Sequence, residues 1–167
     1  MSRREIIKNR LFLSVAVSRL PNFIANPNTG ETVQDLHKCT IHLNSETMDQ
    51  LHSSYASAAY QRIPSDRPMI EMVIPSSVDS TIAPTGAHVC LLFTQFTPIS
   101  PSNGSWSDPN FKEAYANKVF DIIEEYAPGF KASIVGTDVL TPWDIEQTFG
   151  LTGGVSQIQS TPFSTVS

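Results

Sequence analysis

The feature that most constrains the fold of this chain is a run of five apolar residues, VCLLF, at Val89–Phe93. Successive side chains of a strand point to opposite faces of its sheet, so both faces of this run are apolar. A strand with one face in water favours alternation instead. The run therefore predicts a strand over residues 88–96 in the interior of a sheet, with cover on each side. The pattern becomes polar at Thr94 and Gln95.

Four other segments have the patterns of strands. They are residues 11–17, 38–43, 69–74 and 131–135. In 38–43 the apolar side chains of Cys39, Ile41 and Leu43 alternate with polar ones, which predicts one buried face and an outward His42. The connection between 69–74 and 88–96 contains two prolines and a glycine among its polar residues, which indicates a wide loop and not a tight hairpin.

Helix signals lie between these strands. Asp108 is a capping residue and Pro109 favours the first helical position. The apolar stripe of that predicted helix comprises Phe111, Tyr115, Val119, Ile122, Ile123 and Tyr126. A helix capped by Asn44 or Ser45 has the stripe Met48, Leu51, Tyr55 and Ala59. A short third helix begins at a capping box formed by Thr141 and Asp144 and ends at Gly150.

From residue 38 onward the predicted order is strand, helix, strand, strand, helix, strand. This split βαβ order is typical of α+β folds in which one largely antiparallel sheet carries helices on one face. The chain has 167 residues, of which 40% are hydrophobic, enough for a single domain with a core. Because the same order hosts many functions, it does not name one.

Composition excludes several classes of function. A net charge of -5 argues against nucleic acid as a partner, and no apolar run reaches the roughly 18 to 20 residues of a membrane span. The four histidines lack the spacing of metal ligands. Glu124 and Glu125 are neighbours on a helix and diverge around its axis, so they do not form a general acid and base pair. Cys39 and Cys90 are predicted to be buried thiols, as in a reducing compartment. No catalytic or metal-binding residue is assigned.

Three motifs add a resemblance to a known family: IPSSVDSTIAPTG at 74–86, YAPGF at 126–130 and LTPWDIEQTFGLTGG at 140–154. They resemble the pyridine nucleotide-disulfide oxidoreductase domain-containing protein 2 family, which is related to phytoene desaturase and to amine-oxidase-like flavoproteins. The resemblance implies the substrate domain of an FAD-dependent oxidoreductase, with residues 11–154 as part of that domain. It also implies a mitochondrial matrix location; otherwise we expect a soluble intracellular protein. Phe93 and Gln95 share one side of the central strand, where the family's substrate cavity would lie, and simple core packing is the alternative.

The sequence contains no GxGxxG turn after a strand, the feature with which such proteins hold the flavin's pyrophosphate. Gly153 and Gly154 follow a predicted helix instead, and residues 155–167 form a Ser/Thr-rich segment that we expect to be a flexible tail. We therefore expect FAD in the full-length family and none bound by this chain, which alone would be inactive. The expected partners are the missing flavin domain, or another protein, through an exposed sheet face, and a small-molecule substrate of unknown identity.

Two alternatives stay open. The chain could be a truncated or alternatively spliced product that acts as a non-enzymatic interaction module, or a product without a stable fold. The Arg-rich segment 1–10 has two readings as well. It resembles a mitochondrial presequence in composition, but the strand pattern directly after it resembles an internal part of the family, as if the chain began in mid-protein.

Overall fold

The fold is centred on a five-stranded antiparallel sheet in the order β2-β3-β4-β1-β5. The computed structural model describes residues 9–30 and 32–151. The strands are β1 (Arg10–Val17), β2 (Ile41–Leu43), β3 (Ile70–Val73), β4 (His88–Gln95) and β5 (Ile134–Leu140). The α-helices of the described part are α2 (Met48–Ala56), α3 (Pro109–Tyr126), α4 (Phe130–Ser133) and α5 (Pro142–Phe149). The predicted α+β class is confirmed.

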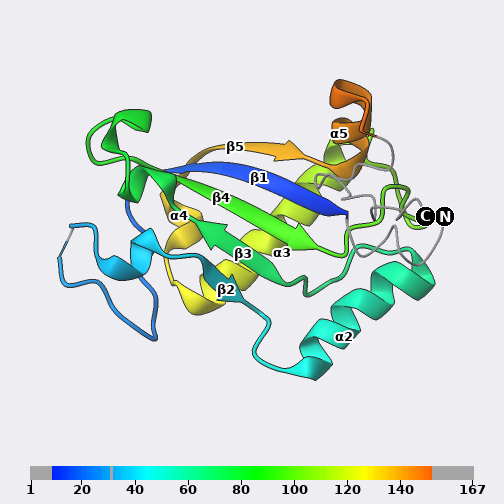
Figure 1. Cartoon of the computed structure of the whole chain (residues 1–167), viewed down its shortest axis with the longest axis horizontal. Helices are drawn as coiled ribbons and strands as arrows, with labels where there is room; N and C mark the ends of the chain where they lie inside the picture. The colour runs from blue at the N-terminus through cyan, green and yellow to red at the C-terminus, as the bar shows by residue number, and fades with distance from the viewer. Residues whose placement is uncertain (1–8, 31, 152–167) are drawn as a thin grey trace, which may run out of the picture.

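Strand β4 lies inside the sheet, as its apolar run predicts, between β3 and β1. It pairs with β1 over the full length of both strands, from Arg10 opposite Gln95 to Val17 opposite His88. Figure 1 shows α3 passing behind β1, β4 and β3, while no described helix crosses the face turned to the viewer. The expectation of cover on each side is therefore wrong: Cys90 and Leu92 face α3 and are fully buried, whereas Leu91 and Phe93 are only partly buried.

Helix α3 supplies the other half of the core. The Asp108 side chain accepts a hydrogen bond from the Asn110 backbone N–H, and Pro109 occupies the first turn, as predicted. The buried side chains of the helix pack against Leu11, Leu13, Val15 and Val17 of β1 and their neighbours in the sheet. They are Tyr115, Ala116, Val119, Phe120, Ile122 and Ile123. Spacing of three and four residues places these side chains on one stripe.

One end of the core is closed by aromatic packing. Trp106 is 1% exposed, its ring centroid lies 5.0 Å from that of Phe111 and 5.6 Å from that of Tyr115, and its indole N–H donates to the Pro98 carbonyl at 2.7 Å. The Tyr115 hydroxyl donates to Thr94 Oγ1 at 3.1 Å, and burial raises the pKa of this phenol to about 12. Trp106 and Tyr115 are therefore structural groups whose polar atoms have partners inside the core.

Three local predictions were wrong. Cys39 is exposed because the segment before β2 forms the 3-10 helix η1 (Asp35–Lys38), which shortens the strand to three residues. Met48, the first residue of α2, is 78% exposed. The helix continues into the π-helical turn η2 (Ser57–Gln61), and the buried residues of the two elements are Ser54 and Ala58, neither of which belongs to the predicted stripe. Residues 130–133 form α4, and the strand predicted at 131–135 lies at Ile134–Leu140 instead.

The connection between β3 and β4 is wide, as predicted, and contains two short 3-10 helices, η3 (Pro75–Ser77) and η4 (Ser80–Ile82). None of the helices formed by residues 9–30 and 32–151 combines the length and the apolar character that crossing a bilayer requires. The predictions for residues 1–8 and for the 155–167 tail lie outside the described residues.

Helix α5 is held against α3 by one partly buried ion pair. Lys112 Nζ lies 2.6 Å from Asp144 Oδ1, and the two side chains are 23% and 17% exposed. Asp144 also completes the predicted capping box, since its carboxylate accepts from the Thr141 backbone N–H at 2.9 Å while its own N–H donates to the Thr141 hydroxyl. Burial alone would raise the pKa of Asp144, but the hydrogen bonds from Lys112 and Thr141 outweigh it and the pKa is lowered.

We expect Asp144→Asn to lower the free energy of unfolding near neutral pH by about 1 to 2 kcal/mol, because Lys112 loses its charge partner. The folded pKa of Asp144 lies below its unfolded value of about 3.9. The stabilisation is therefore complete above about pH 4 and is lost as the pH falls through the folded pKa. Urea unfolding should show the two proteins converging in acid. Asp66→Asn is the control, since its pair with Lys118 also reaches α3 but its side chain is 83% exposed. A constant difference at all pH values would contradict this assignment.

Candidate functional site

The candidate site is the sheet face opposite α3, here named the open face. Directly paired residues of an antiparallel sheet share a face, and one row of such pairs crosses all five strands. This row is His42, Glu71, Phe93, Phe12 and Leu140. The next row is Val73, Leu91, Ser14 and Asp138. The centre of the open face is thus an apolar patch of Phe93, Phe12, Leu140 and Leu91. Polar residues flank this patch on β2 and β3 (His42 and Glu71) and on β1 and β5 (Ser14 and Asp138).

The middle of the open face is hollowed. A shallow cavity of about 240 Å³ lies where β4, β1 and β5 meet. It is lined by Phe12, Leu13, Ser14, Leu91, Leu92, Phe93, Asp138 and Leu140. The rings of Phe12 and Phe93 meet edge to face, with centroids 5.1 Å apart and an interplanar angle of 81°. Such a surface can bind a flat or extended apolar ligand through area and ring contacts, with Asp138 and Ser14 as the polar groups at its rim.

Both residues predicted to line a substrate site, Phe93 and Gln95, lie on the open face. The cavity touches Phe93 but not Gln95. Gln95 stands opposite Arg10 on β1, and its side-chain amide donates to the Glu71 carboxylate. Gln95 therefore marks a polar border of the apolar surface. Whether either residue contacts a substrate stays a prediction.

Sequence reasoning missed the residues that the neighbouring strands bring to Phe93. Phe12 and Leu140 lie about 80 residues before and 50 residues after it, and only pairing with β1 and β5 unites the three. The one signal in the sequence was the period of two in β1, where Phe12 alternates with the buried Leu11 and Leu13. That signal separates two faces without saying which face a helix covers.

An aromatic cluster lies at the end of β4. Phe96 has a backbone φ of 60°, an uncommon conformation for a bulky residue. Its ring centroid lies 5.7 Å from that of Tyr55 on α2, and Tyr55 in turn lies 6.1 Å from Tyr60 in the π-helical turn. These contacts hold the end of β4 against α2. Strained backbone and π-helical turns recur at functional sites, but none of these three aromatic residues lines the cavity of the open face.

The remaining candidate groups have structural partners. The buried His37 ring accepts from the Gln34 backbone N–H at 3.1 Å and contacts the Pro21 carbonyl at 3.2 Å. Glu124 accepts the backbone N–H groups of Gly129 and Lys131, and these hydrogen bonds lower its pKa. In the described ranges no three His, Cys, Asp or Glu side chains gather as metal ligands would.

Glu125 makes a two-point ion pair with Arg67, with both N–O distances at 2.9 Å. This hydrogen bond lowers the pKa of Glu125 and raises that of Arg67. Glu124 and Glu125 thus point to different partners, as their adjacent positions on a helix predict. Neither carboxylate is placed to act as an acid or base on a ligand of the open face.

The residues do not fit the pyrophosphate part of a dinucleotide. That group needs a glycine-rich turn between a strand and a helix in a parallel βαβ unit. The described sheet is antiparallel throughout, and the glycines with positive φ (Gly30, Gly86, Gly129 and Gly150) stand in separate turns. The open face fits only a flat apolar group or an apolar substrate. No chemical step by this chain alone follows from its geometry.

Comparison with known proteins extends these observations. The chain is 54% identical over 143 residues to pyridine nucleotide-disulfide oxidoreductase domain-containing protein 2 of Rattus norvegicus, and 51% identical over 143 residues to that of Mus musculus. Each match covers 85% of this chain and 24% of the relative, so the chain spans about a quarter of their length. It is also 36% identical over 104 residues, 62% of this chain and 20% of the relative, to a 4,4'-diapolycopen-4-al dehydrogenase of Metabacillus indicus. No family model matches the chain.

Proposed function

We infer that this chain, which is homologous to a quarter of pyridine nucleotide-disulfide oxidoreductase domain-containing protein 2, is the substrate-domain portion of an FAD-dependent oxidoreductase. The observation that carries this proposal is the open face, an apolar sheet surface of which no described helix covers the centre. In relatives about four times longer than the matched segment, residues outside that segment would cover the open face. When bound elsewhere in such a protein, a flavin would supply the oxidant for dehydrogenation, in which a C–H bond of the substrate gives up a hydride to the flavin, the adjacent carbon or nitrogen loses a proton to the medium, and a C=C or C=N bond forms.

This chain's own part in that reaction is to bind and shield. One wall of an apolar cavity would be formed by Phe12, Phe93 and Leu140. These side chains would exclude water from the cavity and hold the substrate in one orientation through apolar contacts. Gln95 and Glu71 would set the polar border of this wall. The name of the bacillus relative describes a dehydrogenase acting on 4,4'-diapolycopen-4-al, which agrees with an apolar substrate class. From the family resemblance we extend the proposal to a mitochondrial setting.

A second function has support from the same surface. An apolar face left without its covering domain is a site at which another protein can bind, so the chain alone could act as an interaction module. The two functions differ in whether they require flavin. An oxidoreductase domain works only where a flavin is held over the open face, whereas an interaction module needs none.

The test is a chimera in which the matched 143 residues of the rat relative are replaced by those of this chain. After incubation with FAD and desalting, we expect the chimera to retain the visible absorbance of flavin and the isolated chain to emerge folded and colourless. We expect Phe93→Ala in the chimera to shift the flavin absorption band, because Phe93 would line the cavity that faces the flavin and the band responds to the polarity of its surroundings. Val78→Ala is the matched control, since Val78 is 76% exposed in the loop between β3 and β4.

Each other outcome decides against part of the proposal. An isolated chain that keeps flavin would show that these residues hold the cofactor after all. A colourless chimera beside a flavin-bound rat relative would show that this segment is not equivalent to the one it replaced. A rat relative that itself holds no flavin would overturn the oxidoreductase proposal and leave the interaction module. An unchanged band in Phe93→Ala would remove the open face from the flavin site.

A further inference from the structure

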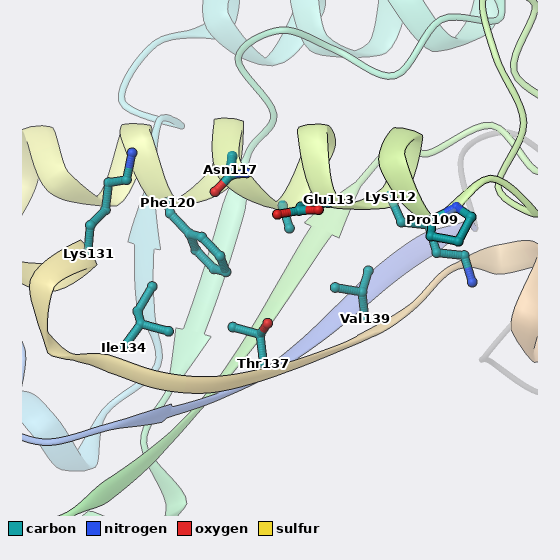
Figure 2. Close-up of a pocket in the computed structure, with 10 residues that line it drawn as sticks. Pro109, Lys112, Glu113, Asn117, Phe120, Lys131, Ile134, Thr137 and Val139 are labelled. Carbon is teal, nitrogen blue, oxygen red and sulfur yellow. The ribbon is translucent and has the colours of Figure 1, made fainter.

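The loop that joins β4 to α3, residues 96–108, contains Asn103, the only asparagine of the sequence that is followed by glycine. The loop leads into α3 at Pro109, which Figure 2 shows at one end of the groove between this helix and β5. Asn103 and Gly104 are both exposed, and neither belongs to a helix or a strand. Water therefore reaches the Asn103 side-chain amide and the peptide bond that follows it.

The chain is held on both sides of this pair of residues but not at the pair itself. On one side the Ser102 backbone N–H donates to the Arg62 carbonyl at 2.8 Å, and the Ser102 hydroxyl donates to the Gln61 carbonyl at 2.8 Å. On the other side the Ser105 carbonyl accepts from the Asp108 backbone N–H at 3.1 Å. Among the residues that the structure describes, none makes a hydrogen bond to the side chain of the asparagine or to the backbone N–H of the glycine. No hydrogen bond therefore has to break before the glycine nitrogen approaches the asparagine side chain.

The core excludes a side chain at position 104. The φ angle of Gly104 is not positive, so the backbone conformation does not require glycine. A β-carbon at this position would overlap the Phe111 ring, and that ring packs on Trp106 with the two centroids 5.0 Å apart. Because a close-packed interior leaves such a ring no room to move aside, packing requires the glycine. Glycine is also the residue that least hinders attack on a preceding asparagine, since it has no side chain.

We propose that Asn103 is a self-modifying site, at which the chain converts its own asparagine to aspartate and isoaspartate. The Gly104 backbone nitrogen bonds to Asn103 Cγ, the Cγ–Nδ2 bond breaks, and ammonia leaves with the proton of the Gly104 amide. The succinimide ring that forms then takes up one water molecule. Hydrolysis at Cγ gives aspartate, and hydrolysis at the main-chain carbonyl carbon gives isoaspartate. Water is the only co-reactant, and nothing is oxidised or reduced.

The two products differ in what they do to the core. Aspartate adds one negative charge at an exposed position and leaves the backbone as it was. Isoaspartate carries the main chain through its β-carbon, which lengthens the backbone by one methylene directly before Gly104. Ser102 is fixed by its hydrogen bonds and Gly104 lies against the Phe111 ring, so the extra carbon displaces the glycine or the ring. Isoaspartate therefore loosens the packing of Trp106, and the modification couples the age of the molecule to the packing of its core.

The experiment is peptide mapping of the folded full chain by mass spectrometry during incubation at mildly alkaline pH, with isoaspartate labelled by an isoaspartyl methyltransferase. We expect both products at Asn103, and we expect their rate of formation to rise with pH because the attacking nitrogen must lose its proton. Asn117 is the matched internal control: it is also exposed, but it lies within α3 and Lys118 follows it. Asn103→Gln should abolish the label in this loop. Conversion of Asn103 no faster than that of Asn117, or conversion in urea but not in the folded chain, would overturn the proposal.

Thermal unfolding followed by circular dichroism tests the effect on the core. Freshly prepared Asn103→Asp should melt at the temperature of the fresh unmodified chain, because the position is exposed. The aged chain should melt at a lower temperature, by a shift that grows with its isoaspartate content, and aged Asn103→Gln should show no such shift. An aged, isoaspartate-rich chain that melts like Asn103→Asp would overturn the coupling to the core. Neither measurement involves flavin, so failure here leaves the proposed function standing.

Discussion

Leu92→Ala is expected to lower the free energy of unfolding by about 3 kcal/mol, and Phe93→Ala, one residue further along β4, by only about 1 kcal/mol. Leu92 is fully buried and faces α3, between Leu13 of β1 and Met72 of β3 in the sheet. Its truncation leaves a cavity that the surrounding core cannot close. Phe93 lies on the open face, where its truncation removes little beyond the edge-to-face contact with Phe12. Urea unfolding followed by circular dichroism measures both changes.

The comparison uses neighbouring residues, so local backbone effects are matched. If Phe93→Ala proved as costly as Leu92→Ala, the open face would be filled within this chain and could not serve as the wall of a substrate cavity. For the flavin spectrum we expect the opposite order, with the larger direct effect from Phe93→Ala. In the chimera with the rat relative, Phe93→Ala should change the flavin spectrum, while Leu92→Ala should act through loss of folded protein.

Trp106→Ala is expected to be at least as damaging, at about 3 to 5 kcal/mol. The ring is 1% exposed and packs between Phe111 and Tyr115, and the substitution also leaves the Pro98 carbonyl without its donor. A β-carbon at Gly104 would overlap the Phe111 ring, which shows how little free space surrounds this cluster. Trp106→Phe should cost less, because it keeps most of the ring area and loses the hydrogen bond.

Trp143→Ala is the matched control for this prediction. Trp143 is 37% exposed and its main described contact is with the Lys112 ammonium, 5.8 Å from the ring centroid. We expect a loss of about 0.5 to 1 kcal/mol. Thermal and urea unfolding of the three variants, followed by circular dichroism, rank them. Equal losses of unfolding free energy for Trp106→Ala and Trp143→Ala would show that Trp106, with Phe111 and Tyr115, is not part of the core.

Where a signal is local, the sequence predicted the structure well. Asp108 and Pro109 place the start of α3, and Thr141 with Asp144 places the start of α5, because a cap is formed within four residues. Gly150 ends α5 with a φ of 66°, a conformation that glycine adopts without strain. The strands β1 and β4 were predicted from runs of apolar residues that are too long to form a turn.

The predictions failed where local preference and tertiary contact compete. Residues 130–133 include β-compatible positions but continue from the Pro128–Gly129 turn as a helical turn, with Phe130 and Ser133 buried beneath the sheet. Cys39 fits the period of two that Ile41 and Leu43 follow, yet η1 ends just before it and Cys39 lies outside the strand and is exposed. The stripe assigned to α2 assumed a regular helix as far as Ala59, but the π-helical turn after Ala56 changes the direction of Ala59. Met48 lies before this turn, at the first position of the helix, and is exposed there.

The sequence by itself determined the order of most elements, the ends of two helices, the interior position of β4 and the resemblance to an oxidoreductase family. Only the tertiary structure decided that β1 lies between β4 and β5, and that α3 covers one face of the sheet while the other stays open. The reason is physical. Caps and periodicity depend on neighbours along the chain, whereas strand order depends on contacts between residues far apart in it. Phe12, Phe93 and Leu140 meet for that reason alone.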